Sequence, residues 1–194
     1  AIPGFMFAAS LMNKIGITED IVKLSDLLVG RVKGGLAHIN VTTSMLMGGV
    51  SGSSTADVAG VGAVMIPTMN KKGYDTGFSV ALTAASSAIG SIIPPSILMI
   101  IYGASANVSI GALFVAGYLP GVSVGLQQLG ISYYYAKKYN IKADQTLNMN
   151  LREKITVLLR GFIPFSIILI ILGGILGGIM TATEAAAVSS IYVL

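Results

Sequence analysis

The sequence has little charge, no cysteine and only one histidine. Only 10% of its 194 residues are charged, whereas a soluble globular domain carries about 25%. We therefore expect that the chain is not soluble by itself. Without cysteine it cannot form a disulfide, a thiol nucleophile or a cysteine-based metal site, and His38 lacks partners for a zinc site. No basic segment precedes the first apolar run, AIPGFMFAASLM, which therefore does not resemble a signal peptide.

Hydrophobic residues make up 54% of the chain, and apolar stretches of bilayer-spanning length, about 20 residues, recur along it. These stretches predict an all-α membrane protein. The net charge of +4 could suggest a nucleic-acid partner. However, the bases lie in short polar gaps between apolar runs, without interleaved aromatic residues, so we expect contact with the lipid bilayer and no nucleic acid.

Polar gaps divide most of the chain into a series of expected segments. Residues 18–33 are predicted to form an amphipathic helix, because Ile21, Leu24, Leu28 and Val32 recur at helical spacing. The other segments are the end of a transmembrane helix at 1–12, a re-entrant helical hairpin at 35–69, a broken transmembrane helix at 75–106, a transmembrane helix at 108–136, a cytoplasmic loop with an interfacial helix at 137–160, and a transmembrane helix at 161–180.

The hairpin is inferred from length and charge. Residues 48–55, GGVSGSST, interrupt run 35–69 and leave two halves that each extend roughly 21 Å as helix. Neither half crosses a hydrocarbon core of about 30 Å. A hairpin that enters and leaves on one side also places all twelve Lys and Arg residues of the chain on the cytoplasmic side.

Two interruptions at membrane depth predict a binding site. Irregular backbone survives there only where it lines a cavity or is buried in protein, and broken helices carry the substrate and ion sites of secondary transporters. In the second interruption, Pro94 and Pro95 lack backbone donors and free the carbonyl groups near Gly90 and Ser91. A simple proline kink is the structural alternative for this segment.

The first interruption supplies hydroxyl oxygens, which suit a hard cation such as Na⁺. Two readings of its serines stay open, because small residues also allow a hairpin tip to turn and pack closely. For Asp57, the alternatives are a carboxylate that complements the helix dipole and a carboxylate that binds a ligand.

A membrane enzyme is the rival class. An intramembrane aspartyl protease needs two aspartates at membrane depth, where Asp57 stands alone. A serine protease needs a histidine there, and His38 is too near the surface in the expected topology. We therefore expect no enzyme. A passive channel predicts uncoupled flux and a carrier predicts ion dependence, and another elevator-type ion-coupled transporter remains possible.

Several motifs carry a resemblance to a known family. They are GGVSGSSTADVA at 48–59, MIP at 65–67, GYD at 73–75, LTAASSAIG at 82–90, IIPPSI at 92–97, IYG at 101–103 and TEAAA at 183–187. Together they resemble the large membrane subunit (DctM-like) of tripartite ATP-independent periplasmic (TRAP) transporters over essentially the whole chain. Ser91 departs from the pattern, which has proline there. The resemblance makes the chain a fragment that covers the first repeat and, at 183–194, the truncated start of the second.

The resemblance implies half of an inverted-repeat, elevator-type transporter. It implies a sodium-coupled permease of the bacterial inner membrane that imports organic acid carboxylates, with a periplasmic substrate-binding protein and a small membrane subunit as partners. No cofactor is implied besides Na⁺ as the coupling ion. The implied sodium ligands are Ser51, Ser53, Ser54 and carbonyl groups of Gly90, Ile93 and Pro95. The implied substrate contacts are Thr55, Asp57, Ser91 and Ser96.

Overall fold

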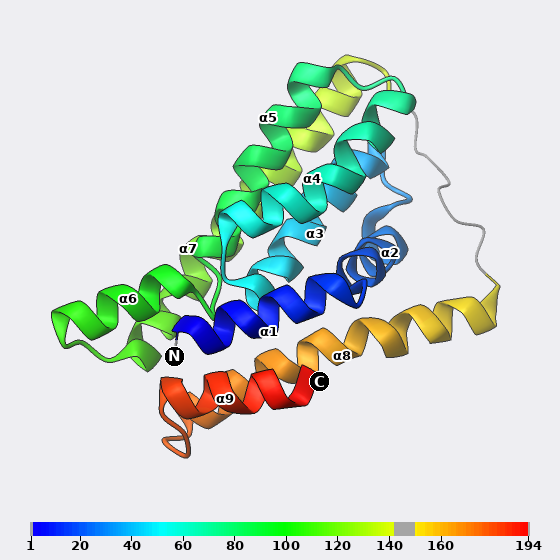
Figure 1. The fold of residues 1–194 in the computed structure, drawn as a ribbon. Coiled ribbons are helices and arrows are strands. Elements are labelled where there is room, and N and C mark those ends of the chain that lie inside the picture. The colour runs from blue at the N-terminus through cyan, green and yellow to red at the C-terminus, as the bar shows by residue number, and fades with distance from the viewer. Residues whose placement is uncertain (1, 142–149, 194) are drawn as a thin grey trace.

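The computed structural model describes residues 2–141 and 150–193, which form helices joined by turns and short loops (Figure 1). This confirms the all-α class, while the crossing of a membrane and the elevator repeat remain predictions. The elements are α1 (Ile2–Lys14), α2 (Ile17–Val29), α3 (Gly35–Ser51), α4 (Ser54–Lys71), α5 (Thr76–Ser87), the 3-10 turn η1 (Ala88–Ser91), α6 (Ile97–Ala106), α7 (Ile110–Lys138), α8 (Leu151–Leu176) and α9 (Ala182–Val193).

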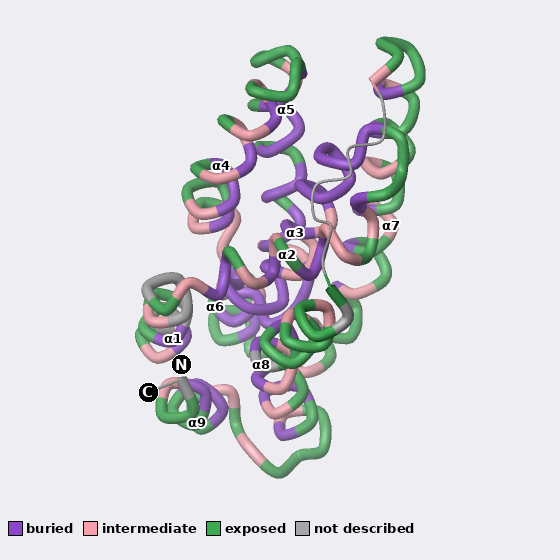
Figure 2. Tube along the Cα trace, turned by 90° about the vertical axis from the view of Figure 1, so that its right-hand side faces the viewer, coloured by how far each residue is buried: buried purple, intermediate pink, exposed green. Residues whose placement is uncertain are grey.

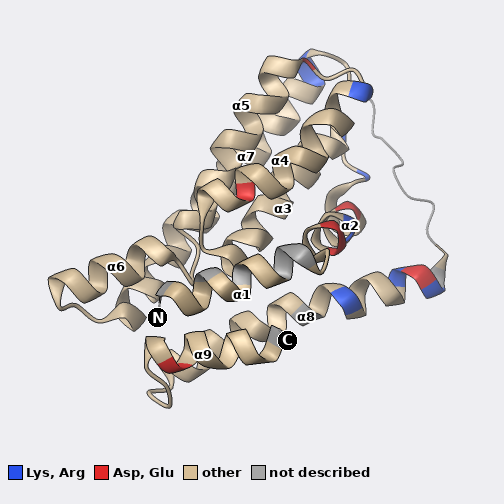
Figure 3. Cartoon of the chain, viewed as in Figure 1, with Lys and Arg blue, Asp and Glu red and all other residues tan. Residues whose placement is uncertain are grey.

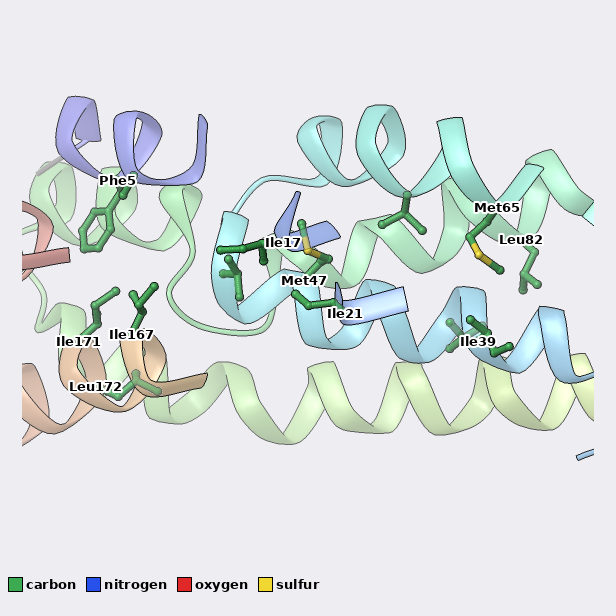
Figure 4. Close-up of a cluster of buried hydrophobic side chains, with 14 of the residues drawn as sticks. Phe5, Ile17, Ile21, Ile39, Met47, Met65, Leu82, Ile167, Ile171 and Leu172 are labelled. Atoms are coloured by element: carbon green, nitrogen blue, oxygen red, sulfur yellow. The ribbon is translucent and has the colours of Figure 1, made fainter. Parts of the chain in front are cut away.

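α3 lies at the centre of the fold. It contacts α2, α4, α5, η1, α7 and α8, and most of its length is buried (Figure 2). Hydrophobic side chains from these helices pack around Met47 and Ile39 of α3 (Figure 4). Polar side chains on the face toward α5 pair with each other: the Asn40 amide donates to Thr83 Oγ1 at 2.7 Å, and Ser44 Oγ lies 2.9 Å from Ser86 Oγ.

Each sequence interruption contains a stretch without α-helix. α3 continues through Ser51, so the first turn is only Gly52 and Ser53, shorter than the eight-residue interruption in the sequence. Gly52 has a left-handed φ of 62°, and Ser53 caps α4 by accepting from the Ala56 N–H. At the second interruption, α5 continues into the 3-10 turn η1, and residues 92–96 that follow are not helical. Ser96 caps α6.

Within residues 2–141 and 150–193, two helices are long and apolar enough to cross a membrane, namely α7 and, within α8, residues Arg152–Leu176. α8 differs from the expected division into an interfacial helix ending at 160 and a span from 161 to 180. It is one helix: a capping box of Asn150 and Glu153 starts it, and it continues through Gly161 and Pro164. It ends at Leu176, before Gly177 and Gly178, and the latter has a positive φ. The expected cytoplasmic loop lies partly at 142–149, outside the described residues.

α2 is amphipathic but shorter than the expected 18–33. Ile21 and Leu24 are buried against the bundle, where α2 contacts α3 and α8. Leu28 and Val32 are exposed. Val32 lies beyond the end of α2 at Val29, and the expected contact of this segment with the membrane surface remains a prediction. α1 packs against α9, and Ser190 Oγ donates to the Gly4 carbonyl at 2.9 Å.

Candidate functional site

The two breaks in the helices lie against each other, although about forty residues of sequence separate them. The Ile97 N–H donates to the Gly52 carbonyl at 3.2 Å, which ties the tip of the hairpin to the start of α6. A Cβ added to Gly52 would collide with the Pro95 carbonyl oxygen. A Cβ added to Gly48 would lie 3.0 Å from Gly90 Cα. Glycine therefore allows the two backbones to approach at both points.

Asp57 is fully buried where the breaks meet. Its Oδ1 accepts a hydrogen bond of 2.6 Å from Ser51 Oγ, across the two-residue turn. Its Oδ2 is buried and finds no hydrogen-bond partner among the described residues. This oxygen lies against the backbone of Gly90, where an added Cβ would strike it. We call Ser51, Asp57 and Gly90 the inner group. An unpaired carboxylate oxygen is costly to bury, so the inner group is suited to a cation.

A second cluster of polar residues faces an open pocket with a volume of about 260 Å³. We call it the outer pocket. It is lined by Gly52, Ser53, Ser54, Thr55, Ser91, Ile97 and Leu98. Both α4 and α6 begin at this pocket, so the partial positive charges of two helix N-termini lie beside it.

The structure regroups the residues named from sequence. Ser51 and Gly90 of the implied sodium set lie in the inner group, whereas Ser53 and Ser54 line the outer pocket. Asp57, assigned to the substrate set, belongs to the inner group. The substrate set keeps two members in the outer pocket, Thr55 and Ser91.

Two hydroxyl groups of the predicted sets have clear local roles. Ser53 Oγ lies 3.0 Å from Thr55 Oγ1 and caps α4. Ser96 is buried, donates to the Ser91 carbonyl at 2.7 Å and caps α6. Ser96 therefore holds the second break together. The backbone at Ile93 and Pro95 is buried beside the hairpin tip, with the Pro95 carbonyl facing Gly52.

Among the described residues, no three His, Cys, Asp or Glu side chains are close enough to hold a metal ion. The side-chain oxygens of the inner group come from one carboxylate and one hydroxyl. Hard oxygen ligands with a single negative charge match a monovalent cation such as Na⁺ better than a thiophilic metal.

Residues 1–194 match the family described as the DctM component of the tripartite ATP-independent periplasmic transporter. The chain belongs to this family. The match confirms the resemblance that the motifs suggest. Because the family is one of transporter components, it also agrees with the expectation that the chain is not an enzyme.

Relatives in this family span the whole chain. It is 43% identical to the sialic acid TRAP transporter large permease protein SiaM of Vibrio cholerae, covering 100% of this chain and 45% of SiaM. It is 36% identical to the C4-dicarboxylate TRAP transporter large permease protein DctM of the same species, covering 99% of this chain and 42% of DctM. It is 42% identical to YgiK of Salmonella typhimurium, covering 100% of this chain and 44% of YgiK. The chain thus spans less than half the length of these relatives.

Proposed function

We propose that this chain is part of the large permease subunit of a sodium-coupled TRAP transporter that imports an organic acid carboxylate across the bacterial inner membrane. Relatives carry names that refer to sialic acid, C4-dicarboxylates and 2,3-diketo-L-gulonate, all of which are carboxylates at neutral pH. A small membrane subunit and a periplasmic substrate-binding protein are the proposed partners. The single observation that carries the ion coupling is the buried carboxylate of Asp57 at the junction of the two breaks.

The proposed sodium site is the inner group completed by backbone carbonyls of the second break. Asp57 supplies the charge, and its free Oδ2 supplies a coordination position that no described residue satisfies. Ser51 Oγ, 2.6 Å from Oδ1, supplies a neutral oxygen at the same point. The carbonyl groups of Gly90, Ile93 and Pro95 are the proposed remaining ligands. A bound Na⁺ would neutralise a charge that is otherwise costly inside a membrane.

The proposed substrate site is the outer pocket. The helix N-termini of α4 and α6 favour a carboxylate group, and the hydroxyls of Ser54 and Thr55 can donate to it. Ser91 Oγ donates to the Ala88 carbonyl at 2.9 Å and would have to leave it to bind the substrate. The hairpin turn, Gly52 and Ser53, lines the pocket and directly follows Ser51 of the inner group. Binding of a cation on one side of this turn can therefore affect the shape of the pocket on the other, which is what coupled transport requires.

Separate substitution of two serines tests this division. We expect Ser51→Ala in the full-length permease to raise the sodium concentration for half-maximal uptake about tenfold, the equivalent of 1.4 kcal/mol. Ser54→Ala should instead raise the KM for the transported acid and leave the sodium dependence unchanged. Uptake into proteoliposomes, with the acids named for the relatives as test substrates, provides both values. Identical effects of the two variants would refute the division, and sodium-independent uptake by the wild type would favour a passive channel or another coupling ion.

The distribution of charge supports the proposed multi-pass topology. Lys and Arg residues gather around one end of the bundle, where α4 and α7 end and α8 begins (Figure 3). α6 and α9, which extend toward the opposite end, contain none. This asymmetry is typical of a cytoplasmic face.

Cysteine labelling tests the topology, since the chain has no cysteine of its own. We expect cysteines at positions 33 and 72 to react with an impermeant maleimide from the cytoplasmic side, and a cysteine at position 107 from the opposite side. All three native residues are exposed. Because α3 and α4 lie between positions 33 and 72, labelling of these two sites from opposite sides would show that the hairpin crosses the membrane rather than re-entering it.

A further inference from the structure

α7 presents a face of three glycines, one helical turn apart, to the rest of the bundle. Gly117, Gly121 and Gly125 are all buried, and none of them has a positive φ. Their backbone conformation is therefore open to any residue. Since glycine destabilises a helix interior relative to alanine, the reason for these glycines must be space.

Two of these glycines lie directly against the second break. A Cβ added to Gly117 would lie 2.5 Å from the Ile92 carbonyl oxygen, and one added to Gly121 would lie 2.5 Å from Ile93 Cγ1. Both separations are far shorter than the 3.5–4.0 Å of favourable contacts between carbon atoms. Gly125 instead meets the thioether of Met45, a flexible side chain that can move aside.

The break is therefore held from two sides. The hairpin tip approaches it through Gly52, which faces the Pro95 carbonyl, and through Gly48, which faces Gly90. α7 approaches it through Gly117 and Gly121. Ile93 and Pro95 are both buried. A displacement of this segment away from α7 would move its carbonyl groups relative to Asp57.

We propose that Gly117 and Gly121 are positioning residues for the ion site. They fix how closely the break approaches α7 and thereby set where the carbonyl groups of Ile93 and Pro95 lie relative to Ser51 and Asp57. This proposal rests on the sodium site of the proposed function. On this proposal, α7 contributes to the affinity for sodium although it supplies no ligand.

A sodium titration of thermal stability tests the proposal without knowledge of the substrate. The purified full-length permease is melted at increasing NaCl, with KCl keeping the ionic strength constant. A fit of the stabilisation to RT ln(1 + [Na⁺]/Kd) gives the apparent Kd for Na⁺, which is the midpoint of sodium binding. We expect Gly117→Ala to raise this midpoint roughly tenfold, within the range seen when residues that orient metal ligands are replaced. Gly121→Ala, which displaces only a side chain, should raise it less.

Gly130→Ala is the matched control, because Gly130 lies on the same helix and its added Cβ would meet nothing within 4 Å. We expect its midpoint to equal that of the wild type. If Gly117→Ala does not reach the membrane, Gly121→Ala decides the question. Lower melting temperatures with unchanged midpoints would reduce both glycines to packing residues and overturn the proposal. A wild-type melting temperature that is insensitive to sodium would overturn the sodium site itself.

Discussion

Replacement of Asp57 by asparagine is expected to reduce sodium-dependent uptake roughly 100-fold, since the interactions of a charged group are worth about 1.5–3 kcal/mol. Asparagine has nearly the same size, and its oxygen can still accept the hydrogen bond from Ser51. It lacks the negative charge that would balance a bound cation. Expression and membrane insertion should persist, because a neutral side chain is less costly to bury than a carboxylate. Uptake into proteoliposomes at saturating and limiting sodium measures the loss.

Asp75→Asn provides the control for loss of a carboxylate. Asp75 is exposed and caps α5 by accepting from the Phe78 N–H at 2.9 Å. Asparagine is an equally favoured N-cap residue, so this variant should transport normally. If Asp57→Asn showed normal sodium dependence, Asp57 would have only a structural role in the hairpin and would not bind the cation.

Replacement of Gly52 by alanine is expected to abolish uptake and to lower the melting temperature. The left-handed conformation costs alanine about 1–2 kcal/mol relative to glycine, and the alanine Cβ also collides with the Pro95 carbonyl oxygen. The turn and the second break must then separate, which disturbs the inner group and the outer pocket together. Thermal unfolding in detergent and uptake into proteoliposomes report the two effects.

Gly73→Ala isolates the conformational cost. Gly73 has a φ of 87°, and an added Cβ there meets nothing within 4 Å. This variant should carry the conformational cost alone and keep its transport. Equal losses of stability in the two variants would show that contact with Pro95 is unimportant.

Glycine, serine and proline revealed where the helices are interrupted, because these residues act through local backbone conformation. The extent of the first interruption was harder to predict. Gly48 and Gly49 are poor helix formers, yet α3 continues through them. Tertiary packing overrides the local preference here, since Gly48 lies against Gly90 and Gly49 against Ile168. A local pattern contains no information about such partners.

The pairing of Ser51 with Asp57 shows the same limit. Both residues were candidates from sequence, but they were assigned to different ligands. Their side chains meet because the turn between α3 and α4 is only two residues long, which brings positions six apart into contact. With an interruption of eight residues, as the sequence suggests, no specific pair could be predicted. The contact of α7 with Ile92 was likewise missed, because glycine spacing on a helix does not identify its neighbour.

The burial of α3 has a consequence for biosynthesis. α3 is synthesised before α4, α5, α7 and α8, all of which pack against it. Until they are made, Asn40, Ser44 and other polar side chains of α3 have no partners on α5 and would face lipid at a cost. These side chains gain their partners only once α5 has been synthesised, so we expect the hairpin to reach its final position after the helices that follow it in the chain.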